Sequence, residues 1–544
     1  MYLKEFERWA AEPSLREAAK AELEAMRGSD EKIKENFGAT LKFGTAGLRG
    51  IMEQGCNKMN VHTVRKASQG LADYLTAAFD EPSVVVSYDS RLNSRVFAEE
   101  TAAVLTANGV KTYIFEQMMP VPVLSFAVRR LKASAGVMIT ASHNPKAYNG
   151  YKVYNSTGGQ ILDEEAGKIL AEIEKLDIFD DVKTMDFDEA LKKGCSLTPE
   201  YVYEDYLAEM EKATDVSKER EVGIVYTPLN GSGRKPVQET LTRSGFSFFT
   251  VPEQEEEDGN FTTCPYPNPE KAEVYEIAAK YAKEQAADII LATDPDCDRV
   301  GLMAKHGEEY VLFSGNEVGG LLFNFICQLE GENAAGKKLF TSMVSTPLVD
   351  RIAENYGVEV ERTLVGFKYI GDKIENNQKE FIFGFEESNG YLVGTYARDK
   401  DGVAAARLIC QMAAYYKSKG KTLVDVLEDI YQETGYVADK TVTLEISSQD
   451  ESREMMKKLR DMDRVNEAME NISGYRDYAD PASCTGLPYA DIVQMDFADK
   501  SRVIVRPSGT EPKIKIYLSS CCSEMELCHR RNDEIMGKIA ELIK

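Results

Sequence analysis

One pattern occurs three times in this sequence: a short apolar run ends in a turn of small polar residues and is followed by a helical segment. The runs predict strands at Val84–Tyr88, Gly223–Tyr226 and Lys338–Ser342. Buried strands that alternate with helices are typical of α/β proteins, and their repetition indicates related units. The sequence therefore predicts an α/β fold built from three similar units.

The rest of the chain predicts a fourth unit and two accessory helical segments. At roughly 100–200 residues per domain, 544 residues suggest three to five domains. Residues 436–544 alternate strands and helices with fewer glycine-rich loops, so we expect a fourth unit there. Residues 1–37 predict a helical arm on the surface, and residues 199–220 predict a connecting helix. We place the four domains at residues 1–205, 206–316, 317–435 and 436–544.

Charge and composition exclude several classes of function. The chain carries a net charge of −25 and no basic stripe, which argues against nucleic-acid binding and against anionic membranes. The N-terminus has no apolar signal segment, and the longest apolar run is too short to span a bilayer. Ten scattered cysteines without a C-x-x-C pair argue against a zinc site or a disulfide framework. With four histidines, a multi-histidine metal site is not expected, and we expect a cytoplasmic protein with reduced thiols.

Residues 136–145 contain an apolar run that stops at small polar residues and a proline. We expect a buried strand that delivers a rigid loop to its carboxyl end, where open α/β sheets bind ligands, so Ser142 is a candidate nucleophile. A Ser-His pair is more often a turn or a helix cap, and no G-x-S-x-G elbow surrounds Ser142. Because adjacent side chains seldom face each other, His143 is not expected to serve as its base. The Asn149-Gly150 pair predicts a tight hairpin that folds Lys152 back towards Ser142.

Three aspartates, Asp294, Asp296 and Asp298, occupy alternate positions after a predicted apolar strand. Alternate side chains of an extended loop can converge on one cation, and carboxylates suit a hard ion such as Mg²⁺. An EF-hand is excluded because Arg299 replaces the required glycine and Lys305 replaces the final glutamate. The alternative to a metal site is a solvated acidic turn.

A divalent ion held by three carboxylates leaves a net negative charge, so positive groups are expected close by. Arg299 is adjacent to the last aspartate. An oxygen of a phosphorylated Ser142 would supply a fourth ligand. A serine phosphate ester held by Mg²⁺ can serve as a phosphoryl donor.

Further loops have the composition of anion or sugar sites, although each also fits an ordinary turn. Three glycines surround Arg49 in residues 44–50, and their backbone amides could approach an anion. Arg506 precedes a turn of hydroxyl and glycine residues between two predicted strands, which fits a phosphate cradle. Glu386 and Ser388 offer an acceptor and a donor for sugar hydroxyls. Three charged residues that follow could help to hold a phosphate: Arg398, Lys400 and Asp401.

Together, four of these loops resemble the motifs of the α-D-phosphohexomutase family. They are Thr-Ala-Ser-His-Asn-Pro (140–145), Asp-x-Asp-x-Asp-Arg (294–299), Gly-Phe-Glu-Glu-Ser (384–388) and Arg-Pro-Ser-Gly-Thr (506–510), in the family's order and spacing. The match covers nearly the whole chain. The resemblance implies four domains around a central cleft: three similar mixed α/β units and a smaller C-terminal α+β domain with a TATA-binding-protein-like fold.

Two further segments point to one branch of that family. Residues 44–50 and 146–152 most resemble the phosphoglucomutase-2 and phosphopentomutase branch, which includes bacterial α-phosphoglucomutases. Some bacterial mutases have a histidine shortly after the Glu-x-Ser loop. Residues 389–391, Asn-Gly-Tyr, contain none, so no general base is assigned there.

The resemblance also implies residue roles. Ser142 resembles the serine that carries the phosphoryl group, and it joins the three aspartates as a metal ligand. His143, Lys152 and Arg49 match the other catalytic positions, with Lys152 and Arg49 as candidates for proton transfer and charge stabilisation. The implied substrate-binding residues are Thr45; the orienting loop Thr363, Gly366 and Lys368; the sugar loop Glu386 and Ser388; Arg398 and Lys400; and the phosphate loop Arg506, Ser508, Gly509 and Thr510.

The implied activity is interconversion of α-D-glucose 1-phosphate and glucose 6-phosphate through a phosphoserine enzyme and a glucose 1,6-bisphosphate intermediate, with Mg²⁺ or Mn²⁺ as the metal. The alternatives within the family are mannose or pentose phosphate as substrate, or net synthesis of the bisphosphate. A Mg²⁺-dependent sugar-phosphate phosphatase and a non-catalytic sugar-phosphate-binding protein are the alternatives of other classes. The expected partners are small sugar phosphates, and the expected oligomeric state is a monomer or a weak dimer.

Overall fold

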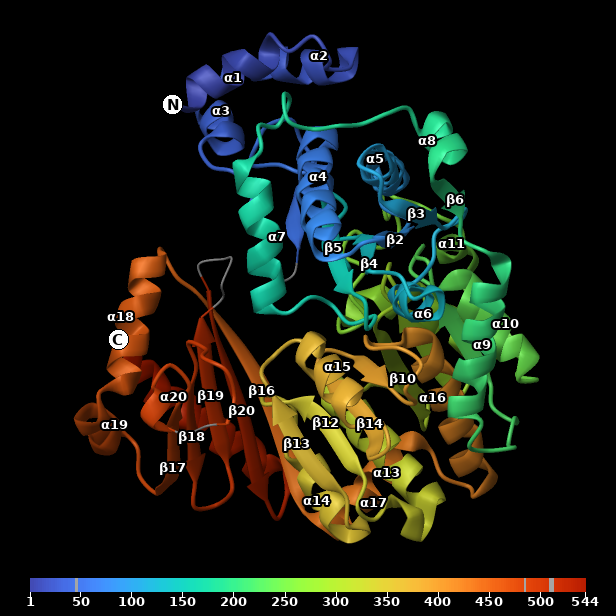
Figure 1. Ribbon diagram of the computed structural model, residues 1–544. Helices are drawn as coiled ribbons and strands as arrows, with labels where there is room; N and C mark the ends of the chain where they lie inside the picture. The colour runs from blue at the N-terminus through green and yellow to red at the C-terminus, as the bar shows by residue number, and fades with distance from the viewer. Residues whose placement is uncertain (45–46, 484–485, 508–512) are drawn as a thin grey trace. The chain divides into compact units, whose positions relative to one another are not determined.

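The computed structural model describes residues 1–44, 47–483, 486–507 and 513–544 (Figure 1). Thr45 and the predicted phosphate-loop residues Ser508, Gly509 and Thr510 lie outside these ranges. The chain forms two compact units. The first comprises Met1–Leu312, Phe367–Lys379 and Asn389–Lys419, and the second comprises Phe313–Gly366, Glu380–Ser388 and Gly420–Lys544.

The first sheet of the first unit is mixed and six-stranded. Its order is β1 (Leu48–Ile51), β5 (Tyr148–Asn155), β4 (Ala135–Ile139), β2 (Ser83–Tyr88), β3 (Lys111–Ile114) and β6 (Cys195–Leu197). Strands β4, β2, β3 and β6 run parallel, while β5 is antiparallel to β4 and to β1. β2 and β4 are buried along nearly their whole length, because strands in the parallel part of a sheet are covered on both faces.

The second sheet of this unit has five strands. Its order is β11 (Glu309–Leu312), β10 (Val300–His306), β9 (Ile289–Thr293), β7 (Ile224–Thr227) and β8 (Phe248–Thr250). β7 is parallel to β8 and β9, and β10 is antiparallel to β9 and β11. The unit's longer helices are α4 (Val61–Ala78), α5 (Ser94–Ala107), α6 (Val121–Leu131), α7 (Asp163–Lys175), α9 (Glu200–Thr214), α10 (Arg234–Arg243), α12 (Glu276–Glu284), α15 (Phe367–Asn376) and α16 (Gly402–Ser418); α8 (Phe187–Lys193) and α11 (Pro252–Glu255) are short.

The N-terminal arm is helical, as expected, but it has a small core of its own. Helices α1 (Tyr2–Ala10), α2 (Glu17–Met26) and α3 (Asp30–Phe37) bury a group of apolar side chains that includes Trp9. The Trp9 ring meets His62 of α4 edge-on, with ring centroids 5.5 Å apart, and meets Phe179 at 5.1 Å. Aromatic contacts therefore join the arm to α4 and to Phe179 of the first α/β region.

The second unit contains a parallel sheet and an antiparallel sheet. In the parallel sheet, β12 (Lys338–Ser342) lies between β13 (Glu359–Thr363) and β14 (Phe381–Glu386), with helices α13 (Gly315–Glu330), α14 (Leu348–Tyr356) and α17 (Leu423–Thr434). The antiparallel sheet has the order β16 (Tyr436–Glu445), β20 (Lys513–Cys522), β19 (Arg502–Pro507), β18 (Val493–Phe497) and β17 (Ile472–Asp477). Apolar residues of α18 (Gln449–Arg460), α19 (Met462–Ala468) and α20 (Met525–Ile543) share its core (Figure 1).

The three α/β sheets repeat one strand arrangement, which confirms the prediction of three similar units. In each sheet the first parallel strand lies between the second and the third, giving β3-β2-β4, β8-β7-β9 and β13-β12-β14. The third strand then leads into a candidate functional loop. Ser142 follows β4, Asp294 follows β9 and Glu386 ends β14. The repeated topology therefore places three different sets of polar residues at one equivalent point of the fold.

The predicted hairpin turn at Asn149-Gly150 is wrong in its position. Both residues lie inside β5, and the connection from β4 consists of residues 140–147. Gly150 is required there because a Cβ atom would lie 2.6 Å from the carbonyl oxygen of Thr140 and 2.7 Å from that of Leu48. The expected consequence still holds, since β5 runs back along β4 and carries Lys152 opposite Met138.

Two expectations about composition can be compared with the described residues. The nine cysteines in the described part of the chain are all free thiols. None of the helices in residues 1–44, 47–483, 486–507 and 513–544 combines the length and the apolar character needed to cross a bilayer.

Candidate active site

Ser142 lies at a sharp bend directly after β4. Its backbone φ is 52°, in the left-handed region, and its side chain is buried. The hydroxyl donates a hydrogen bond of 2.9 Å to Asp294 Oδ2, and Oγ lies 3.2 Å from His143 Nδ1. The expectation that His143 would not face Ser142 is therefore wrong, because the left-handed bend turns two successive side chains towards the same space.

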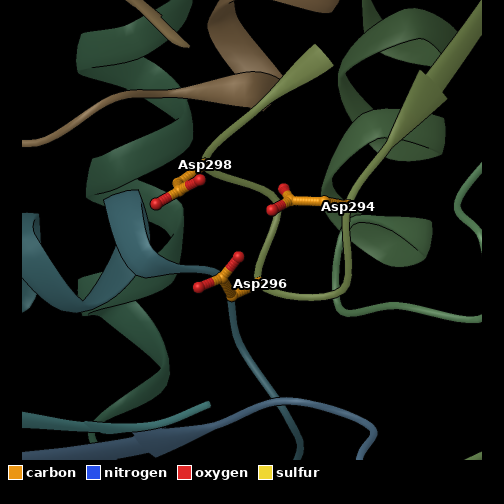
Figure 2. A group of neighbouring side chains, drawn as sticks. All are labelled: Asp294, Asp296 and Asp298. Atoms are coloured by element: carbon orange, nitrogen blue, oxygen red, sulfur yellow. The ribbon is translucent and has the colours of Figure 1, made fainter. Parts of the chain in front are cut away.

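The three aspartates form one buried group between β9 and β10. Figure 2 shows Asp294, Asp296 and Asp298 on a single loop with their carboxylates converging. One oxygen from each lies within 4.8 Å of the others, and none of the three residues is more than 2% exposed. The alternative of a solvated acidic turn is therefore wrong.

The loop that carries the aspartates is fixed by contacts with a later part of the chain. Cys297 adopts a φ of 49° and is fully buried, and its carbonyl oxygen accepts a hydrogen bond of 3.1 Å from the amide of Gly402. Gly402 is the first residue of α16, whose N-cap is Asp401. The amide of Val300 also donates to the carbonyl of Asn389 at 3.0 Å. The first residue of α16 thus fixes the backbone of the aspartate loop through a hydrogen bond to Cys297.

Three cations surround the carboxylates. Lys152 Nζ lies 2.8 Å from Asp296 Oδ2 and 3.7 Å from Asp298 Oδ2. Lys400 Nζ lies 3.1 Å from Asp298 Oδ2, and Arg299 Nε lies 3.7 Å from Asp298 Oδ1. Asp399 also pairs with Lys400 and Glu270 with Arg299, so the acidic residues outnumber the three cations. A divalent cation and a phosphoserine dianion could be added together without changing the net charge.

The pKa directions follow from this arrangement. Burial works to raise the pKa of Asp298, but Lys400, Lys152 and Arg299 outweigh it and hold the pKa below its usual range. Burial, reinforced by the two neighbouring carboxylates, raises the pKa of Asp294 well above its usual value. Burial works to lower the pKa of Lys152, but Asp296 and Asp298 outweigh it, so the pKa is raised and the ammonium stays charged.

His143 has the opposite character. Burial lowers its pKa well below the ordinary value, and the charges of Arg299 and Arg49 lower it further. The imidazole is therefore neutral at physiological pH. Because the Ser142 hydroxyl donates its one proton to Asp294, the neutral ring can donate to Oγ in the tautomer that carries its proton on Nδ1.

The donor set fits a hard divalent cation. Asp296 Oδ1 and Asp298 Oδ1 are buried without a hydrogen-bond partner. Buried polar atoms are normally satisfied, and a carboxylate oxygen in this condition is suited to a cation. Oxygen-only ligation by three carboxylates favours Mg²⁺ or Mn²⁺ over the metals that prefer nitrogen or sulfur ligands.

Sequence reasoning missed several residues that support this group. Thr140 Oγ1 lies 2.6 Å from Asp89 Oδ2 and 3.2 Å from Asp296 Oδ2. Asp399 accepts a hydrogen bond of 3.0 Å from Tyr154 and pairs with Lys400 at 3.2 Å. One signal for Asp89 was available: it directly follows β2, whose carboxyl end lies beside that of β4 in a parallel pair.

The other predicted residues of the first unit occupy different surroundings. Arg49 is an exposed residue of β1 and is paired with Gly150 of β5. Its positive charge helps to lower the pKa of His143. Lys368 Nζ pairs with Asp163 at 2.6 Å. The fully buried Arg398 pairs with Glu375 at 2.6 Å. Of the predicted substrate-binding cations of this unit, the structure brings Lys400 into the aspartate group, and Lys368 and Arg398 pair with acidic residues elsewhere.

The second unit brings together part of the predicted sugar site. The amide of Gly366 donates a hydrogen bond of 2.8 Å to Glu386 Oε1, and the Thr363 hydroxyl donates to the carbonyl of Leu364 at 2.9 Å. Ser388 is half-buried in the loop after β14. Arg506 is half-buried near the end of β19, in the antiparallel sheet.

Comparison with protein families gives four matches that follow one another along the chain. Residues 40–178, 202–307 and 314–434 match the phosphoglucomutase/phosphomannomutase alpha/beta/alpha domains I, II and III. Residues 452–536 match the C-terminal domain of the same family. The N-terminal arm, up to residue 39, precedes the first match.

Curated relatives are similar over nearly the whole chain. A phosphoglucomutase of Staphylococcus saprophyticus is 34% identical over 517 residues, which cover 90% of this chain and 92% of the relative. A phosphoglucomutase of Staphylococcus aureus is 33% identical over 534 residues, covering 95% and 94% of the two chains.

Solved structures show the same fold at lower identity. A putative phosphomannomutase from Thermus thermophilus aligns with a TM-score of 0.70 at 23% identity, covering 92% of this chain and 99% of that one. The open form of parafusin, a phosphoglucomutase from Paramecium, aligns with a TM-score of 0.72 at 18% identity, covering 93% and 95%. The chain is an enzyme of the mutase type, and it belongs to the phosphoglucomutase/phosphomannomutase family.

Proposed function

We propose that this enzyme interconverts α-D-glucose 1-phosphate and glucose 6-phosphate through a phosphoserine at Ser142 and a glucose 1,6-bisphosphate intermediate. One observation carries the proposal: the buried Ser142 hydroxyl lies 2.9 Å from Asp294, at the edge of a group of three carboxylates that suits a divalent cation. Glucose as the sugar is supported by the relatives named phosphoglucomutase.

The first transfer moves the phosphoryl group from Ser142 to the free 6-hydroxyl of glucose 1-phosphate. The bond from phosphorus to Ser142 Oγ breaks, a bond from phosphorus to the sugar oxygen forms, and the proton of the sugar hydroxyl is taken up by the released Ser142 Oγ. Lys152 is a charged ammonium beside Asp296. We therefore propose that it stabilises the negative charge on the phosphoryl group during transfer. His143 Nδ1, 3.2 Å from Oγ, orients the serine that is left behind.

The second transfer returns the other phosphate of the bisphosphate to Ser142 and releases glucose 6-phosphate. Ser142 Oγ attacks this phosphorus, the bond from phosphorus to the sugar O1 breaks, and the serine proton passes to O1. Asp294, Asp296 and Asp298 would hold Mg²⁺, with Ser142 as a further ligand. The bound metal would supply electrophilic polarisation of the phosphoryl oxygens.

The remaining predicted residues are assigned to substrate recognition. Glu386, positioned by the amide of Gly366, would accept hydrogen bonds from sugar hydroxyls, with Ser388 on the same loop. Arg506 would pair with the phosphate that does not react. The further assignments remain as predicted: Thr45, Thr363, Lys368, Arg398, Lys400, Ser508, Gly509 and Thr510 as substrate-binding residues, Arg49 as a catalytic residue, and Arg299 as a positive group beside the metal.

We also propose the wider organisation predicted from the sequence. The four domains, at residues 1–205, 206–316, 317–435 and 436–544, would line a common cleft, so that a bisphosphate can turn between two anion sites. Small sugar phosphates would be the partners of a monomer or weak dimer in the cytoplasm. The three successive family matches of the α/β type support the division of the chain.

The test is a coupled isomerisation assay at fixed Mg²⁺ with trace glucose 1,6-bisphosphate. The ratio kcat/KM is compared for glucose 1-phosphate, mannose 1-phosphate and ribose 1-phosphate. We expect glucose to be preferred by about tenfold or more, which corresponds to about 1.4 kcal/mol in the transition state. We expect Ser142→Ala to abolish turnover with the fold intact, and Ser156→Ala, at an exposed serine of the same unit, to leave turnover unchanged.

Other outcomes would assign a different activity. A dominant mannose or ribose rate would change the substrate and keep the phosphoserine mechanism. Accumulation of bisphosphate without isomerisation would indicate a synthase, and release of inorganic phosphate as fast as isomerisation would indicate a phosphatase. Normal turnover by Ser142→Ala would overturn the phosphoserine mechanism itself.

A further inference from the structure

The backbone of Ser142 is held in an unfavourable conformation by specific contacts. A left-handed φ costs a residue other than glycine about 1–2 kcal/mol, so it persists only where the surroundings impose it. The amide of Ser142 donates a hydrogen bond of 2.8 Å to Thr140 Oγ1. Its carbonyl oxygen accepts one of 2.5 Å from Arg91 Nη2. Both polar backbone groups of the nucleophilic serine are therefore fixed by side chains.

Arg91 binds much more of the loop than Ser142 alone. Its side chain is completely buried in the segment that follows β2. Nη1 donates to the carbonyls of Pro145 and Tyr148 at 3.0 and 3.1 Å, and Nη2 also donates to the carbonyl of Asn144. One planar guanidinium thus gathers four carbonyl oxygens of residues 142–148, which span the whole connection between Ser142 and β5.

Asp89 connects the contacts at both ends of the Ser142 peptide. Its carboxylate lies 3.3 Å from Arg91 Nε, and its Oδ1 accepts a hydrogen bond of 3.0 Å from the backbone amide of Arg91. It also accepts hydrogen bonds of 2.6 Å from Thr140 Oγ1 and 2.7 Å from Ser94 Oγ. The Thr140 hydroxyl in turn receives the Ser142 amide. Asp89 therefore fixes the amide side of Ser142 through Thr140 and the carbonyl side through Arg91.

An aromatic ring packs against the guanidinium of Arg91. The Phe261 ring lies 5.1 Å from the Arg91 guanidinium carbon, and this phenylalanine is fully buried with a φ of 47°. The nearby Gly259 packs so tightly that a Cβ atom would lie 2.7 Å from the amide of Leu92. A lysine ammonium could not reproduce four in-plane hydrogen bonds against a ring face.

We propose that Arg91, held by Asp89, is a positioning residue that sets the orientation of Ser142 for phosphoryl transfer. This inference rests on the proposed function, because the orientation matters only if Ser142 carries the phosphoryl group. Neither side chain needs to touch the sugar. Their loss should therefore reduce the rate of transfer far more than the affinity for the sugar phosphate.

The test uses the full-length variants Arg91→Lys and Asp89→Asn, with Arg95→Ala as the matched control. Arg95 is an exposed arginine of α5 that pairs with Glu99. Each protein is loaded with phosphate from glucose 1,6-bisphosphate, and the fraction phosphorylated at Ser142 is measured by peptide mass spectrometry. The single-turnover rate of transfer to glucose 1-phosphate is then scored per phosphorylated serine, so unfolded protein does not enter the result.

We expect Arg91→Lys and Asp89→Asn each to lower this rate by about 100-fold, the effect of misplacing a reacting group by about 1 Å. The KM for glucose 1-phosphate should change by less than about threefold, and Arg95→Ala should match the unmodified protein. A transfer rate within about threefold of the unmodified protein for either variant would overturn the inference. Equal losses in rate and sugar affinity would also overturn it. If the unmodified protein is not phosphorylated at Ser142, the proposed function itself fails.

Discussion

Histidine 62 should make the folding stability of the first unit depend on pH. Burial, together with the charge of Arg65, lowers its pKa to about 4. Its ring is packed between Trp9 and Phe179 and is 7% exposed. In the unfolded chain the pKa returns to about 6.5, so as the pH falls below that value the unfolded state takes up a proton first. The free energy of unfolding should therefore fall between pH 6.5 and pH 4, and this contribution should level off below.

The magnitude follows from the difference between the two pKa values. A shift from about 6.5 to about 4 corresponds to about 3 kcal/mol once both titrations are complete. Between pH 7.5 and pH 5 the linkage relation gives about 2 kcal/mol from this residue alone. Other groups also titrate in this range, so the prediction concerns the difference between two proteins. His62→Gln cannot be protonated and should lose about 2 kcal/mol less stability than the unmodified protein over that interval.

The assay is urea unfolding followed by tryptophan fluorescence at pH 7.5 and pH 5. Trp9 is the single tryptophan of the chain and touches the His62 ring, so the signal reports on the arm and its attachment. His306→Gln, at an exposed position in β10, is the control for the histidine-to-glutamine change itself. Equal pH dependence for His62→Gln and the unmodified protein would refute the reasoning.

Three further predictions concern the aspartate group. Lys152→Met leaves Asp296 without its buried partner and should lower the free energy of unfolding by about 3–5 kcal/mol, measured by urea unfolding; an unchanged value would contradict the pairing. Mg²⁺ at about 100 times its Kd should stabilise the protein by about 2.7 kcal/mol, measured as a rise in thermal midpoint that a chelator reverses, and Asp296→Asn should abolish the rise. Gly402→Ala would place a Cβ atom 2.7 Å from the carbonyl oxygen of Cys297 and displace the aspartate loop. The kcat in the coupled assay should therefore fall by about 100-fold. Gly167→Ala is the control and should leave kcat unchanged, because its Cβ atom would meet no atom within 4 Å.

Much of the fold could be predicted because its signals are local. Strands β2, β7 and β12 are buried apolar runs bounded by turn residues, and the sequence places each of them to within a few residues. The loops after β4 and β9 could be found by the same reasoning, since small polar or acidic residues directly follow an apolar run. Ser142 and the three aspartates could therefore be predicted as site residues from the sequence. It could also be predicted that Ser142 lies close to the aspartates.

What the sequence could not show depends on backbone angles and on distant packing. The meeting of His143 with Ser142 requires the left-handed φ at Ser142, which no residue preference predicts for serine. The pairing of Lys400 with Asp298 joins the start of α16 to the loop after β9, and the attachment of Trp9 to His62 joins the arm to α4. Each of these contacts joins two segments that are far apart in the chain, and the sequence of one segment does not predict which other segment it will contact.

The repeated strand arrangement has a consequence for how such a protein can change over time. The three-strand arrangement is common to all three sheets, whereas the strands added beside it differ, since antiparallel strands extend the first two sheets. A hydroxyl stands at the end of the third parallel strand in one unit, three carboxylates in another and a glutamate in a third. Duplication of one ancestral unit would therefore have supplied three equivalent positions, at which separate parts of one reaction could be acquired on the same strand arrangement.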